Sequence, residues 1–310
     1  MKSSSIAASL LWAYGAVALP AGLSARQSTN IDTTVLQFAL TLEHLENAFY
    51  HGALNNFTEQ DFMNAGYSAT YYNNLKYISV DEQSHVQLLS SALTAAGVTP
   101  NAACTYKFPY TDVKSFITLS SVLEGVGTSA YLGGAPLITS KAYLTVAGSI
   151  LVTEALHTSY QRATVGEVPF ANPYGTPLDP MSVYTLAAMF ITSCPAKNAA
   201  LPFTAFPTLT YDGTMESMCW SGESIKLTAA KSIPAGSYVT FVSGLNVVSV
   251  RGTISGMDIT AEIPAVAMGQ TYVLVTSKDV EGTLVDASVL FGPAIIEVMP
   301  AAPVIDDTIV

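Results

Sequence analysis

Two copies of the pattern Glu-x-x-His are the residues of this sequence best suited to chemistry. The first joins Glu82 to His85, and the second joins Glu154 to His157. Residues three apart on a helix lie on the same side, so each copy presents a carboxylate and an imidazole together. A hard oxygen ligand combined with a borderline nitrogen ligand suits iron or manganese. The pattern therefore predicts four metal ligands on two helices.

Two more glutamates lie within apolar stretches. Glu43 follows Leu42, and Glu124 follows Leu123. A buried carboxylate without a partner is costly, and a shared cation removes that cost. The order Glu, Glu-x-x-His, Glu, Glu-x-x-His over four helices is the ligand set of a di-metal carboxylate bundle. We therefore predict a site for two Fe or two Mn ions, with the ligands Glu43, Glu82, His85, Glu124, Glu154 and His157.

Alternatives remain for the first helix of the site. Glu46 can replace Glu43 as a ligand, because both begin near the same helix face. We favour Glu43, because Tyr50 follows it by seven residues and falls in register with it. His44 and His51 fit surface or hydrogen-bonded histidines better than ligands. The whole set also fits a relic bundle, in which a buried polar network holds no metal.

Helices must carry these residues. Before about residue 205, apolar side chains recur at spacings of three and four, which is the period of an amphipathic helix. Five helices are predicted, over 35–49, 75–93, 113–132, 142–164 and 181–193. About 15 residues join the second helix to the third, and at roughly 3.3 Å per residue they can cross the length of a bundle.

From Ser224 onward the apolar rhythm changes to two. Short β-branched and aromatic runs, separated by Gly and Pro, predict strands over 238–242, 247–254, 271–275 and 285–291. This spacing favours a small, Ig-like β-sandwich. The predicted organisation is a signal peptide at 1–21, a four/five-helix bundle at 30–201, a linker at 202–221, a β-sandwich at 222–300 and a tail at 301–310.

Composition limits the function. Of 310 residues, 50% are hydrophobic and 11% are charged, so the chain is globular rather than disordered. The net charge is −11, which argues against nucleic-acid partners, because phosphate binding needs clustered basic residues. Three cysteines, Cys104, Cys194 and Cys219, allow one disulfide and one free thiol in a secreted protein, and the pairing stays open.

The N-terminus is typical of a secreted protein. Lys2 precedes an apolar run from Ile6 to Leu19, and Ala16-Val17-Ala18 is a cleavage-site pattern. A membrane anchor is the alternative, although a spanning helix needs about 20 apolar residues. The sequon at Asn56 fits an extracellular glycoprotein. We expect a secreted, extracellular or cell-wall protein without membrane attachment after signal cleavage.

Residues 31–200 resemble the ferritin-like superfamily, and more closely the fungal secreted Rds1-like, or late sexual development, stress-response family. The segments 40–50 and 81–85 carry the resemblance. It implies a ferritin-like bundle in which Glu82 and Glu154 bridge two metal ions. Similarity to bacterioferritin implies that Tyr50 lies beside the metal site, where it is the candidate catalytic residue. The resemblance implies no settled activity.

The function expected from these features is an oxidoreductase of stress or development. It would act on O2 or a peroxide, with catalase-like or ferroxidase-like chemistry. One alternative is a metal-free structural or protective protein of the cell wall or spore. Another is a binding module whose β domain recognises cell-wall components or a protein.

Overall fold

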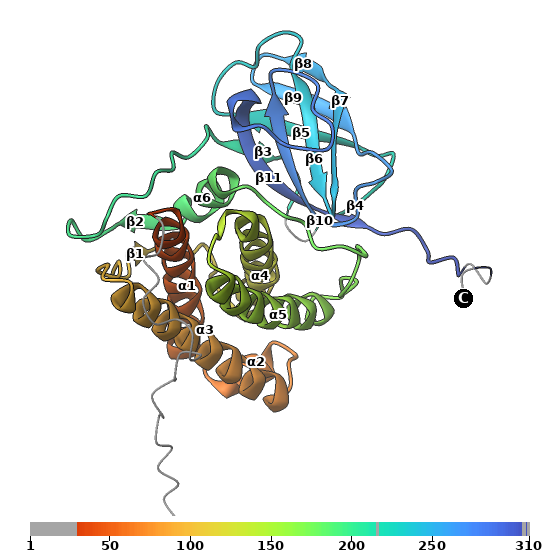
Figure 1. The fold of residues 1–310 in the computed structure, drawn as a ribbon. Coiled ribbons are helices and arrows are strands. Elements are labelled where there is room, and N and C mark those ends of the chain that lie inside the picture. The colour runs from red at the N-terminus through yellow and green to blue at the C-terminus, as the bar shows by residue number, and fades with distance from the viewer. Residues whose placement is uncertain (1–29, 215–216, 306–307, 309–310) are drawn as a thin grey trace, which may run out of the picture.

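The computed structural model describes residues 30–214, 217–305 and 308, and the predicted signal peptide lies outside them. A helical part precedes a β-rich part, as the sequence predicts (Figure 1). The α-helices in the described residues are α1 (Asn30–Asn56), α2 (Glu59–Asn64), α3 (Ala69–Ala95), α4 (Val113–Gly134), α5 (Lys141–Thr164) and α6 (Pro180–Ala188). The short helix α2 was not expected. None of these helices has the length and apolar character needed to cross a bilayer.

The four long helices form the bundle as two hairpins. Helix α1 packs along α3, and α4 packs along α5. The crossover from α3 to α4 contains β1 (Thr105–Tyr106), which pairs with β2 (Ile191–Ser193) after α6. Beside this pair, a disulfide joins Cys104 to Cys194 and leaves Cys219 as a buried free thiol. The crossover is thus covalently attached to the segment that follows the last helix.

Local sequence explains where these helices begin. Short polar side chains at the N-caps accept hydrogen bonds from backbone N–H groups of the first turn, and they are Ser68, Asp112, Ser140 and Asp179. Gly97 lies just beyond the end of α3 with a φ of 75°, which glycine adopts without strain. The positions of α3, α4 and α5 therefore follow from short-range rules.

The β-rich part is a two-sheet sandwich. Its strands are β3 (Leu209–Tyr211), β4 (Met218–Trp220), β5 (Ser224–Ala229), β6 (Tyr238–Ser243), β7 (Asn246–Arg251), β8 (Thr253–Ser255), β9 (Asp258–Glu262), β10 (Gly269–Thr276) and β11 (Val289–Met299). One sheet has the order β4-β11-β10-β6-β7 and the other β3-β5-β9-β8. The inward residues of β5 alternate with outward ones, and Leu227 and Phe241 meet in the apolar layer between the sheets.

The structure differs from the predicted linker at 202–221. This segment contributes β3, which pairs with β5, and β4, which runs parallel to β11. Strands of three residues are too short to show an alternating pattern, so the prolines and glycines dominated the sequence signal. The segment is therefore part of the sandwich as well as its connection to the bundle.

The sandwich is packed directly on the bundle. Tyr272 on β10 donates a hydrogen bond to the backbone oxygen of Gly125 at 3.0 Å. Arg162 on α5 forms a two-pronged ion pair with Glu297 on β11, at 2.9 and 2.6 Å. Val242, Tyr272 and Leu274 belong to the same apolar core as the bundle residues. The β unit thus holds the outer side of α4 and α5, the helices that carry half of the predicted ligands.

Candidate metal centre

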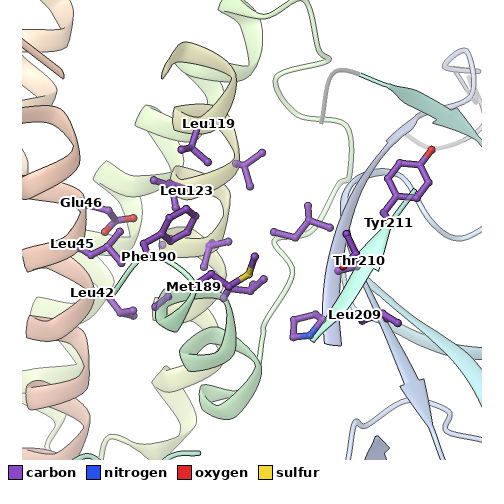
Figure 2. A pocket seen from close by; sticks show the side chains of 18 of the residues that line it. Leu42, Leu45, Glu46, Leu119, Leu123, Met189, Phe190, Leu209, Thr210 and Tyr211 are labelled. Atoms are coloured by element: carbon purple, nitrogen blue, oxygen red, sulfur yellow. The ribbon is translucent and has the colours of Figure 1, made fainter. Parts of the chain in front are cut away.

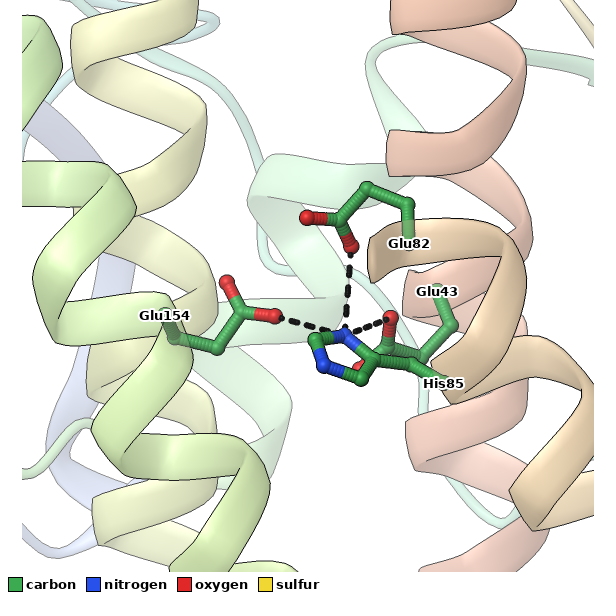
Figure 3. A group of neighbouring side chains, drawn as sticks. All are labelled: Glu43, Glu82, His85 and Glu154. Atoms are coloured by element: carbon green, nitrogen blue, oxygen red, sulfur yellow. Dashed lines mark hydrogen bonds and ion pairs between the residues drawn. The ribbon is translucent and has the colours of Figure 1, made fainter. Parts of the chain in front are cut away.

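The structure brings all six predicted ligands together in the bundle interior. Each side chain is buried, and they come from four helices: Glu43 from α1, Glu82 and His85 from α3, Glu124 from α4, and Glu154 and His157 from α5. They form two overlapping groups. The first contains Glu43, Glu82, His85 and Glu154, shown in Figure 3, and the second contains Glu82, Glu124, Glu154 and His157. Within each group, one ligand atom per residue lies within 4.8 Å of the others.

Glu82 and Glu154 belong to both groups. The Oε2 atom of Glu82 lies 3.4 Å from Nδ1 of His85, while its Oε1 atom lies 3.0 Å from Nδ1 of His157. Glu154 places Oε1 at 3.2 Å from Nδ1 of His85. A carboxylate that directs one oxygen to each of two neighbouring groups has the arrangement of a bridging ligand. Clusters of this kind can hold a metal ion.

Unsatisfied polar atoms show that the cluster suits a cation. Although several of these atoms lie close to an imidazole nitrogen, eight buried side-chain atoms of the described residues form no hydrogen bond. Six of them are Glu82 Oε1 and Oε2, Glu124 Oε2, Glu154 Oε1 and Oε2, and His157 Nδ1. Buried polar atoms normally have partners, and leaving one without a partner costs about 1–3 kcal/mol. All six atoms are ligand atoms that iron or manganese accepts. The residues present therefore fit the metal that the sequence predicts.

Burial and neighbouring charges shift the pKa values of the cluster, in several cases in opposite directions. Burial raises the pKa of Glu82, contacts with His157 and His85 lower it, and the result is about 7. Burial and then the charge of Glu82 raise the pKa of Glu154 well above its ordinary value. Burial lowers the pKa of both imidazoles, but the surrounding carboxylates raise it by more. The pKa of His157 therefore rises to about 12, and the pKa of His85 also rises strongly. Burial therefore favours the protonated form of Glu82 and Glu154 when no cation is bound.

Two tyrosines form hydrogen bonds between α1 and α4 to the glutamates that belong to one group each. Tyr50 on α1 donates a hydrogen bond to Oε1 of Glu124 on α4, and Tyr131 on α4 donates one to Oε1 of Glu43 on α1. The sequence suggested that Tyr50 serves the site beside Glu43, whereas its hydroxyl contacts the glutamate of the other hairpin. Tyr131 was missed, although it follows Glu124 by seven residues just as Tyr50 follows Glu43.

Further polar side chains support the site from outside. Oδ2 of Asp81 lies 3.2 Å from Nε2 of His157 and can orient the ring, as carboxylates commonly do for metal-binding histidines. Gln161 donates to the hydroxyl of Tyr50 at 3.2 Å, and Tyr71 donates to Oε1 of Gln161 at 2.6 Å. Sequence reasoning missed these three residues, because only their contacts across the bundle distinguish them.

The alternative residues of α1 lie outside both groups. Glu46 is buried, and burial followed by the charge of Glu154 raises its pKa well above its ordinary value. Nε2 of His44 lies 3.0 Å from the backbone oxygen of Asn101, and His51 is exposed beside Asn55. The structure therefore places Glu43, rather than Glu46 or these histidines, among the ligand atoms.

Gly127 is required by the close approach of two carboxylates. A Cβ atom at this position would lie 2.6 Å from Oε1 of Glu46 and 3.0 Å from Oε2 of Glu154. We expect Gly127→Ala to weaken manganese binding about tenfold, which corresponds to about 1.4 kcal/mol, because Glu46 must move and the ligand Glu154 must shift by a few tenths of an ångström. Titration of the metal-free protein, followed by calorimetry, measures this change.

The matched control for Gly127 lies in the same helix. A Cβ atom at Gly134 meets nothing within 4 Å. Gly134→Ala should leave metal affinity unchanged and raise the free energy of unfolding by about 0.4–1 kcal/mol. Equal metal affinity in the two variants would show that Gly127 has no role in spacing the carboxylates.

Comparisons with known proteins agree with this geometry. Residues 31–167 match the model of the ferritin-like domain family. Over 183 residues the chain is 28% identical to "Protein rds1" of Schizosaccharomyces pombe, a match that covers 58% of this chain. The chain spans 44% of the length of that curated relative. The buried helical cluster thus lies inside the matched segment, and residues 31–167 are similar to the ferritin-like domain family.

Proposed function

We propose that this protein holds two iron or two manganese ions in its bundle and acts as an oxidoreductase on O2 or a peroxide. The observation that carries the proposal is the convergence of four carboxylates and two imidazoles in two groups that share Glu82 and Glu154. Four carboxylates supply the negative charge that two divalent cations balance, and the imidazoles complete the ligand set of a di-metal carboxylate bundle. When bound, such ions would supply the electron transfers that O2 and peroxide chemistry needs.

The chain's own residues have separate tasks in this proposal. Glu43, His85, Glu124 and His157 would each bind one ion, and Glu82 and Glu154 would bind both. Tyr50 and Tyr131 hold Glu124 and Glu43 through hydrogen bonds and fix the directions of their carboxylates. Burial, and then the adjacent glutamate charge, raise the pKa of both phenols well above its ordinary value, so each keeps its proton. Tyr50 is the candidate proton donor closest to the Glu124 side of the centre.

We also propose that the protein works outside the cell. The disulfide between Cys104 and Cys194 supports this, because disulfides persist in oxidising compartments. Asn56, the residue of the sequon, is exposed at the end of α1 and is accessible to a glycan. A secreted protein that consumes peroxide would fit a role in stress or development, with O2 or peroxide as its small-molecule partner and cell-wall components around it.

The deciding experiment is elemental analysis of protein purified from its own secretion without a chelator. We expect about two Fe or Mn ions per chain. The loaded protein should then consume hydrogen peroxide or take up O2, which an oxygen electrode records. No metal, and none bound after anaerobic reconstitution with either ion, would contradict the proposal. The cluster would then be a buried polar network in a structural or protective protein, or in a binding module that works through its sandwich.

A further inference from the structure

A cavity lies between the bundle and the β-sandwich. Its volume is about 280 Å³, and α1, α4, the end of α6, β3 and β11 line it. Figure 2 shows Leu42, Leu45 and Glu46 on one side and the strand 209–211 on the other. Met189 belongs to its lining and is largely exposed, so this part of the lining reaches the protein surface. The cavity exists only because the sandwich covers the outer side of the bundle.

The lining has one charged side chain among its described residues. Leucine, valine, alanine, phenylalanine and proline dominate it, Thr210 and Tyr211 add hydroxyl groups, and Glu46 carries the charge. Glu46 is only 5% exposed, and it forms no hydrogen bond or ion pair with any described residue. A buried carboxyl group without a partner is costly in the free protein. A ligand with one hydrogen-bonding group would remove that cost.

Glu46 also connects the cavity with the candidate metal centre. Gly127 contributes to the cavity lining, and the position of its absent Cβ lies 2.6 Å from Oε1 of Glu46 and 3.0 Å from Oε2 of Glu154. The two carboxylates therefore face each other across a residue with no side chain. A molecule that bonds to Glu46 would place its polar end beside the shared ligand Glu154.

We propose that this cavity binds an uncharged, mainly aliphatic small molecule whose single hydroxyl group bonds to Glu46. The size follows from volume, since a cavity of about 150 Å³ binds benzene, so 280 Å³ suits roughly ten non-hydrogen atoms. The ligand is proposed to be uncharged because the described lining residues include no Lys, Arg or His that could neutralise a carboxylate on it. An anionic fatty acid would bury a negative charge in an apolar lining that offers no cation, close to the carboxylates of the cluster, and is excluded by this chemistry.

This inference rests on the proposed function in one respect, namely that the alcohol would be a substrate or effector of the metal centre. Binding itself is independent of metal. The test therefore uses the full-length chain without metal and titrates it with 1-octanol by calorimetry, with octanoate as the charged probe of the same length. We expect one saturable site for 1-octanol and at least tenfold weaker binding of octanoate at pH 7.5.

Three variants locate the site. Leu123→Trp fills the cavity and should weaken 1-octanol binding at least tenfold. Leu88→Trp fills a second apolar pocket, between α1, α3, α4 and α5, and should leave 1-octanol binding unchanged. Glu46→Leu should weaken binding about fivefold, because it removes the hydrogen bond. Glu46→Gln, which keeps a donor and an acceptor, should restore it to within about twofold.

The outcomes separate this proposal from the preceding one. Absent binding by the wild type, equal binding of octanoate, or full binding by Leu123→Trp would each overturn it. Circular dichroism and thermal melting show whether each variant is folded, and Glu46→Leu tests the site even if the tryptophan variant is not. The metal content of the same wild-type preparation is measured in parallel. Alcohol binding without metal uptake would overturn only the proposed centre, and metal uptake without alcohol binding would overturn only the cavity site.

Discussion

Replacing Glu82 by alanine is expected to abolish metal binding, from about two ions per chain to none that survives desalting. Glu82 is the residue on which both groups depend, since its two oxygens lie 3.4 and 3.0 Å from the imidazoles of His85 and His157. Its removal takes one ligand from each group and removes a carboxylate that connects the two proposed metal positions. Elemental analysis after anaerobic reconstitution with Mn(II) or Fe(II) gives the stoichiometry directly.

Controls for the Glu82 variant are available in the same chain. Glu262 is an exposed glutamate on β9, and Glu262→Ala should bind metal like the wild type. The fold should survive in Glu82→Ala, because the change removes a buried carboxyl whose desolvation is unfavourable in the metal-free state. Two ions per chain in Glu82→Ala would eliminate Glu82 as a bridging ligand and with it the arrangement proposed here.

The second large effect concerns pH. Glu46, Glu82 and Glu154 have pKa values raised above the ordinary 4.5, so the metal-free native state holds more protons than the unfolded chain above that pH. Its free energy of unfolding therefore falls as pH rises from about 4.5 through 7. His157, with a pKa raised from 6.5 to about 12, acts in the same direction, because its stabilising charge is lost only as pH rises further. The metal-free protein should be most stable near or below pH 5.

Metal reverses this dependence. Ligand carboxylates must lose protons and ligand imidazoles must be neutral before they bind an ion, so the stabilisation by metal grows as pH rises. At a free concentration about 1,000 times the Kd, one ion adds about 4 kcal/mol to the free energy of unfolding. This corresponds to an increase in Tm of roughly 10 °C. The difference in Tm between loaded and metal-free protein should thus widen from pH 5 to pH 8.

Thermal melting at several pH values, with Mn(II) or with EDTA, measures this difference. The Glu82→Ala variant is the control, since its Tm should not respond to Mn(II) at any pH. A metal-induced shift that is the same at pH 5 and pH 8 would contradict the view that the metal replaces protons on the buried carboxylates.

Short-range features of the sequence were enough to predict the four long helices and the six residues that the fold brings together. Glu and His three residues apart share a helix face wherever the helix packs, and caps such as Asp112 act within one turn. The spacing of apolar residues predicted the four long helices. Glu43 and Glu124 lie in apolar stretches, which predicted that both side chains are buried, and they are. These signals are local, so they could be recognised without knowing how the helices pack.

Tertiary structure alone decided the contacts between distant segments. The pairing of Cys104 with Cys194, the crosswise bonds of Tyr50 and Tyr131, and the two strands within the expected linker each join residues that nothing in the local pattern relates. The same holds for Glu46, which faces a cavity that the sandwich creates when it packs on α4. Such contacts depend on which apolar faces bury one another, and that is a property of the whole folded chain rather than of any segment.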